Sequence, residues 1–145
     1  MNWKDVAIER LRDYRAKKQA LRNIPLEIEE MESAMISLRS ARPDRIPVKG
    51  GGFSYEDKML SCVVRKEELQ RALDRAKLSV DEITGALQIL SQEEQLILDR
   101  FYINPAKGNV ERLCVELYTE QSTVYRRKDV ALRKFTIAMY GCLES

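Results

Sequence analysis

Histidine is absent from this chain of 145 residues. That absence removes the commonest general base of enzymes and the commonest side-chain ligand of metal ions. The Gly-x-Ser-x-Gly segment that exposes a nucleophilic serine is missing as well. Acidic residues such as Glu27, Glu29, Glu30 and Glu32 stand beside basic ones, with no spacing that points into a cleft. We therefore expect no enzyme activity, no metal and no cofactor, and only a site built from carboxylates alone would contradict this.

Cysteine is scarce, and its positions argue against the common cysteine-based sites. Cys62, Cys114 and Cys142 are far apart, lie among apolar residues and form no Cys-x-x-Cys pair. This spacing predicts buried, reduced thiols rather than disulfides or a zinc site. No apolar stretch resembles a signal peptide or is long enough to span a membrane, so we expect a cytoplasmic protein with no membrane partner.

Glycine and proline are also rare, with 6 and 4 residues, and alternating β-branched runs are few. Hydrophobic residues make up 44% of the chain and charged residues 33%. The abundance of Ala, Leu, Glu, Lys and Arg favours helices over strands. The predicted fold class is therefore all-α.

Residues 1–89 predict an antiparallel helical hairpin that resembles a coiled coil. One helix is expected over 2–39 and a second over 55–90, because neither amphipathic stretch can bury its apolar face alone. The segment from Ser79 to Glu82 has a capping-box pattern, so the second helix could restart there.

In the first of these helices, apolar residues recur at alternating spacings of three and four. This pattern is typical of a coiled-coil seam, and it fits equally a plain core face within the hairpin. Pro25 predicts a kink or a tight restart that keeps both parts on one axis. Leftover apolar residues, including Trp3, Met31 and Ile36, favour a homodimer. The seam residues are Leu21, Ile24, Ile28, Met31, Met35 and Leu38.

The stretch 40–54 contains two prolines and the run Gly50–Gly52, which cannot hold a helix. We interpret it as a flexible connector between the two helices. The glycines lack the Lys-Ser/Thr that follows them in a phosphate-binding loop, so a phosphate cradle is not expected. A basic loop that touches the DNA backbone is the alternative.

Residues 90–145 predict three further helices. The first starts at a Ser-x-x-Glu capping box and covers about 91–102, and a loop over 104–109 follows it. The apolar residues of 113–117 indicate a short helix, and 119–135 a longer one that continues to Gly141.

The stretch 119–135 combines one apolar face with hydrogen-bonding and basic residues on its other faces. It has small or polar residues where a helix start needs a cap, and any of Thr119, Glu120, Gln121 and Ser122 could serve. A helix of this kind suits a reader of the DNA major groove, although a solvated helix with an ordinary charged face would show the same pattern. The residues expected on its buried face are Val124, Ala131, Leu132 and Phe135.

Charge is concentrated in two places on a chain whose net charge is only +2. Residues 1–22 carry seven cations against three acids, and 119–135 carry five against two. A locally basic patch on a nearly neutral protein suits a DNA contact with low non-specific affinity, although ordinary solvated helix faces explain the charge of residues 1–22 as well. By position, the residues expected to face base edges are Gln121, Ser122, Tyr125 and Arg126, and those expected to hold phosphates are Thr123, Arg127, Lys128, Arg133 and Lys134.

Two short motifs carry a family resemblance over the last third of the chain. Ser122-Thr123-Val124 and the Ala-Leu-Arg-Lys run 131–134, preceded by an apolar helix, resemble the helix-turn-helix of sigma-70 region 4. Residues 90–102 look like the leading helix of that family. The segment Ser-Thr-Val-Tyr-Arg-Arg, together with the later Met139-Tyr140-Gly141, is similar to the corresponding sequence of phage late-gene regulators of the ArpU/RinA type. This resemblance implies activation of phage late genes and contact with host RNA polymerase.

One residue departs from the family pattern. The turn position that is often glycine in this motif is Tyr118 here. A bulky residue is disfavoured at positive φ, so we expect the turn to take another geometry.

We therefore predict a sequence-specific transcriptional regulator that binds double-stranded DNA through a domain at 90–145 and dimerises through an arm at 1–89. A phage small terminase subunit is one alternative, and a ring assembly would distinguish it. A helical protein-interaction module without DNA binding is the other, and it predicts no salt-sensitive binding to DNA.

Overall fold

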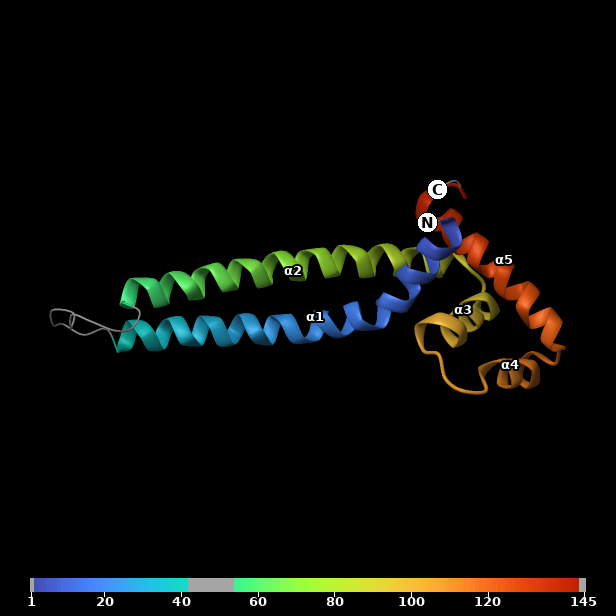
Figure 1. The fold of residues 1–145 in the computed structure, drawn as a ribbon, viewed down its shortest axis with the longest axis horizontal. Coiled ribbons are helices and arrows are strands. Elements are labelled where there is room, and N and C mark those ends of the chain that lie inside the picture. Colours follow the sequence, from blue (N-terminus) through green and yellow to red (C-terminus); the bar gives the residue numbers. More distant parts are fainter. Residues whose placement is uncertain (1, 42–53, 144–145) are drawn as a thin grey trace. The chain divides into compact units, whose positions relative to one another are not determined.

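The computed structural model describes residues 2–41 and 54–143, and every regular element within these residues is a helix (Figure 1). The predicted all-α fold class is therefore confirmed. The predicted connector at 40–54 lies outside the described residues except at its two ends. The elements are α1 (Trp3–Ser40), α2 (Tyr55–Ile89), α3 (Gln92–Leu98), the π-helical η1 (Asp99–Ile103), α4 (Asn109–Leu117) and α5 (Gln121–Tyr140).

The chain divides into two units. The two-helix unit is Gln19–Lys77, and the larger unit combines Met1–Lys18 with Leu78–Ser145. We predicted a division near residue 90, and the structure divides the chain elsewhere. The reason lies in contacts between the start of α1 and the end of α2, for example Tyr14 Oη 2.6 Å from Thr84 Oγ1.

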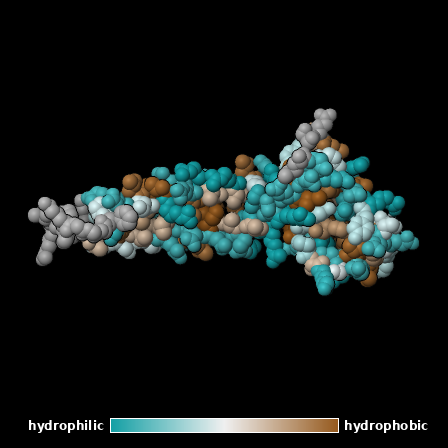
Figure 2. Space-filling model, viewed as in Figure 1, coloured by the Kyte–Doolittle hydropathy of each residue, from teal (hydrophilic) through white to brown (hydrophobic). Residues whose placement is uncertain are grey.

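The two-helix unit has little fully buried surface. Ile28 and Leu69 are its buried apolar residues, at 9% and 6% exposure, and the other predicted seam residues are half-buried. Figure 2 shows hydrophobic side chains between hydrophilic ones on the visible surface over α1 and α2. Two helices therefore cover their apolar faces only in part. The helix α1 continues through Pro25 without a restart.

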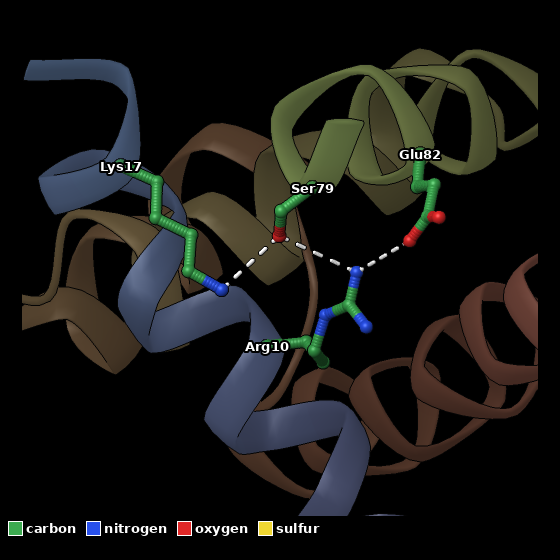
Figure 3. A network of polar contacts seen from close by, with 4 residues as sticks. All are labelled: Arg10, Lys17, Ser79 and Glu82. Carbon is green, nitrogen blue, oxygen red and sulfur yellow. Dashed lines mark hydrogen bonds and ion pairs between the residues drawn. The ribbon is translucent and has the colours of Figure 1, made fainter. Parts of the chain in front are cut away.

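The start of α2 is capped as the sequence predicts, because the Asp57 N–H donates to Ser54 Oγ at 3.2 Å. The second capping pattern, at Ser79 and Glu82, does not restart the helix. Both side chains instead contact α1 (Figure 3). Arg10 Nη2 lies 2.9 Å from Glu82 Oε2 and 3.4 Å from Ser79 Oγ, and Lys17 Nζ donates to the same hydroxyl at 3.1 Å.

The larger unit has a closed core in which α5 packs against α3 and α4. Ile97, Leu113 and Val124 are fully buried there, one from each of three helices. Phe101 and Leu117 pack against this cluster and are partly buried. This core fixes the orientation of α5, the helix that contains the predicted DNA-contact residues.

The three cysteines are free, as predicted, but the expected burial is wrong. Cys62 and Cys114 are half-buried, and Cys142 is exposed because it follows the end of α5 at Tyr140. Within residues 2–41 and 54–143, no helix is long and apolar enough to cross a membrane. The same residues contain no group of three metal-ligating side chains.

Candidate nucleic-acid interface

A tight turn joins α4 to α5. Tyr118 adopts the left-handed conformation, with φ 53° and ψ 47°, so the expectation that a bulky residue would force another geometry is wrong. Its side chain is 95% exposed and meets no obstacle in the fold. The N–H groups of Tyr118 and Thr119 both donate to the carbonyl of Cys114, which offsets part of the conformational cost.

The start of α5 lacks a side-chain cap. The capping position is Glu120, whose side chain accepts no hydrogen bond from the helix. The first turn contains no acidic residue either. The acidic group nearest the positive end of the helix dipole is therefore Glu120 itself, whose exposed carboxylate stands at the capping position.

One face of α5 is buried as predicted. Val124, Ala131 and Phe135 have no exposed surface, and Leu132 has 1%. Thr136 is also buried, and its hydroxyl donates to the Leu132 carbonyl at 2.8 Å. This packed face leaves the opposite side of α5 directed away from the core.

The outward side of α5 presents two arginines with no acidic partner. Arg126 and Arg133 are exposed and lie two helical turns apart, about 10 Å along the axis. Neither one forms a hydrogen bond or ion pair with any other described residue. Ser122 is exposed one turn before Arg126, and Gln121 is exposed at the helix start. Thr123 is half-buried.

Two other cations of α5 face the start of α3 and are paired there. Arg127 forms an ion pair with Glu93, and Lys134 Nζ lies 2.8 Å from Glu94 Oε2. Together with Arg126 they line an open groove of about 470 Å³ between the two helices. The predicted phosphate contacts at Arg127 and Lys134 thus already have an acidic partner within the chain.

Besides pairing with Lys134, Glu94 completes the predicted capping box at the start of α3. Its Oε1 accepts the Ser91 N–H at 3.0 Å, and its own N–H donates to Ser91 Oγ at 3.1 Å. Partial burial by itself would raise the pKa of Glu94. Hydrogen bonds from Lys134 and Ser91, together with the charge of Lys134, outweigh burial and lower the pKa below its ordinary value.

Tyr125 and Lys128 lie on the other side of α5, next to η1. The ring of Tyr125 meets Phe101 edge-on, with centroids 5.8 Å apart. Lys128 Nζ lies 5.3 Å from both ring centroids, close enough for a cation–π contact. Tyr125 keeps 41% of its surface exposed. The cluster holds both side chains at the edge of the outward face.

The predicted contact residues therefore fall into three groups rather than on one surface. The sequence pattern does not reveal the acidic partners on α3, because Glu93 and Glu94 also fit the pattern of a helix start. Nor does it reveal Phe101 as the ring that Lys128 contacts. The signal for the ion pairs is the opposite charge of the two segments, but no sequence spacing relates residues that are 34 and 40 positions apart.

Comparisons with protein-family models, with curated proteins and with solved structures find no match for this chain. The resemblance to phage late-gene regulators therefore stays a prediction from the sequence.

Proposed function

We propose that this chain binds double-stranded DNA by placing α5 in the major groove. The observation that carries the proposal is the outward pair of Arg126 and Arg133, which have no acidic partner among the described residues. Lone arginines on a helix of this kind suit guanine edges and phosphates.

Roles follow from where each side chain lies. Gln121, Ser122 and Arg126 are the candidates for base edges, and Arg133 is the candidate for a phosphate further along the helix. Tyr125 stays a candidate at the edge of the groove because part of its ring is accessible. Lys128, with Thr123, would contact the backbone from the flanks of α5.

The cations on the α3 side have a different role in this proposal. Arg127 and Lys134 would orient α5 through Glu93 and Glu94, and would add less to DNA affinity than their charge suggests. A groove-reading helix needs a fixed orientation, because base contacts depend on the placement of a few side chains.

The narrower proposal is a sequence-specific transcriptional regulator of phage late genes. Its support is the resemblance of residues 122–126 and 131–134 to that class. Such a regulator would act as a homodimer in the cytoplasm and would contact host RNA polymerase. A dimer would read two half-sites, so the spacing in a selected sequence would report the symmetry.

The decisive experiment is selection of bound duplexes from a random pool at two salt concentrations. The full chain is compared with Arg126→Ala and with Arg127→Ala, which removes the same charge from the neighbouring, paired position. We expect Arg126→Ala to weaken the selected site by roughly tenfold or more and to relax one base pair, because an arginine–guanine pair contributes about 1–3 kcal/mol. Arg127→Ala should have a smaller effect.

Arg133→Ala tests the phosphate contact separately. It should weaken all sequences about equally and flatten the dependence on salt. Equal losses from Arg126→Ala and Arg127→Ala would contradict the assignment of roles. No enrichment of any sequence at either salt would contradict DNA recognition and leave a protein-interaction module. A ring-sized mass would favour the terminase alternative.

A further inference from the structure

One end of the two-helix unit has more apolar surface than two helices can cover. Near the start of α2, apolar residues spread over a wider arc of the helix than the single narrow stripe of an ordinary surface helix, while Lys58, Ser61 and Arg65 occupy the remaining side. Leu60 is 61% exposed and Val64 43% exposed, and Ile36 of α1 is 61% exposed. Met59 and Val63 are half-buried. Figure 2 shows hydrophobic side chains over this end of α2.

An ion pair shows which of these residues share one flank of the unit. Lys66 Nζ of α2 lies 3.3 Å from Glu32 Oε1 of α1. Ile36 stands one turn beyond Glu32, and Val63 stands one turn before Lys66, so both lie on the same flank as the ion pair. Met59 is one further turn along the same side of α2. This surface, Ile36, Met59 and Val63 with the Glu32–Lys66 pair at its border, is called the apolar flank below.

We propose that the apolar flank binds the same flank of a second copy of this chain, so that two hairpins form a four-helix bundle. A two-fold axis parallel to the helices would place Ile36 against the partner's Val63, and Val63 against the partner's Ile36. The same axis would bring Lys66 close to the partner's Glu32. Such a surface is complementary to itself, as an isologous interface must be.

The charges favour a second copy over an unrelated protein. Glu32 and Lys66 lie at one level on the two helices, with opposite signs. The two-fold operation turns this pair into a ring of four alternating charges without any further residue. This inference rests on the homodimer of the proposed function and names its interface. It needs no DNA contact, so the mass measurement can fail while DNA selection succeeds, and the reverse.

The first test measures the mass of the full chain by sedimentation over a range of concentrations. We expect a reversible dimer. Ile36→Glu should weaken self-association by roughly tenfold or more, because a carboxylate would lose water at the contact. The matched control is Leu26→Glu, which changes a residue of the same helix with 59% exposure, ten positions away from Ile36. Circular dichroism of both variants reports whether the helices remain.

A monomer at every concentration would overturn the proposal and leave the flank to another partner. Equal weakening by Ile36→Glu and Leu26→Glu, with helices intact, would also overturn it. Dimerisation lost only in Ile36→Glu would support it.

The second test reverses the charge of Glu32 or of Lys66. Association of the two variants when mixed distinguishes ion pairs between chains from the ion pair within one chain. Glu32→Lys and Lys66→Glu each place four like charges at the axis, so each variant alone should dimerise more weakly than the natural chain. Mixing the two variants should restore association, because each cation then meets the partner's acid. The pair within each chain remains broken in the mixture. A mixture that associates no better than either variant alone would overturn the pairing.

Discussion

The two units of this chain differ in how completely they bury large apolar side chains. In the larger unit, Phe135 and Ile97 have no exposed surface. Among the described residues of the two-helix unit, Ile28 and Leu69 are the buried apolar side chains, whereas Leu60 keeps 61% of its surface exposed. The helix α5 has two packed neighbours, α3 and α4, whereas the described residues of the two-helix unit come from α1 and α2 alone, apart from the chain ends next to residues 42–53. The larger unit buries its large apolar side chains within the chain, and the two-helix unit leaves several of them exposed.

The largest expected effect tests this difference in packing. Phe135→Ala should lower the free energy of unfolding of the larger unit by about 3–5 kcal/mol, because it removes a fully buried ring and leaves a cavity. Ile28→Ala in the two-helix unit should cost about 2 kcal/mol or less, since water and neighbouring side chains can fill the partly open site. Native-state hydrogen exchange resolves the two units by their own amides. Equal losses in the two variants would contradict the comparison.

The features that the sequence predicted are local ones. The Ser91–Glu94 capping box, the buried face of α5 and its end at Gly141 all depend on residues a few positions apart. Helical periodicity and capping chemistry act at that range, so a pattern in the sequence is enough to locate them. The all-α fold class follows from the same local preferences.

The features that the sequence did not predict depend on distant segments meeting in space. The pairing of Arg127 with Glu93 joins residues that are 34 positions apart, and the position of Lys128 depends on Phe101. The contact of Arg10 with Glu82 spans 72 positions, and Ser79 accepts hydrogen bonds from Arg10 and Lys17 of α1 instead of capping a helix. Such contacts follow from packing, which sequence spacing does not encode.

A smaller effect is expected at the turn before α5, and it should be confined to the larger unit. Tyr118→Gly should stabilise that unit by about 0.5–1 kcal/mol. Relief of left-handed strain exceeds the entropy that glycine adds to the unfolded chain. Thermal unfolding followed by circular dichroism measures the change. Tyr118→Ala is the control, since alanine keeps the strain and removes the same exposed ring. If the two variants change the stability of the larger unit by the same amount, left-handed strain at residue 118 does not lower that stability.

The smallest expected effect is a dependence of stability on pH that belongs to the larger unit alone. Glu94 has a pKa below its ordinary value of 4.5, so the unfolded chain binds its proton more readily than the folded one. Its contribution is therefore fully present above pH 4.5 and is lost as the pH falls through the lowered value. Glu94→Gln keeps the capping pattern but removes the charge, and should cost a few tenths of a kcal/mol to about 1 kcal/mol near neutral pH.

The difference between the natural chain and Glu94→Gln should shrink towards zero on acidification through that window, measured by hydrogen exchange of α3 and α5 amides. Lys134→Gln, which removes the partner of Glu94, should reduce the same difference, while amides of the two-helix unit should respond to neither change. Parallel pH profiles for the natural chain and Glu94→Gln would mean that the ion pair to α5 adds nothing to the stability of the larger unit. In that case the orientation of α5 would rest on its buried face alone, and the α3 side of the helix would be as free to meet a phosphate as Arg126 and Arg133 are.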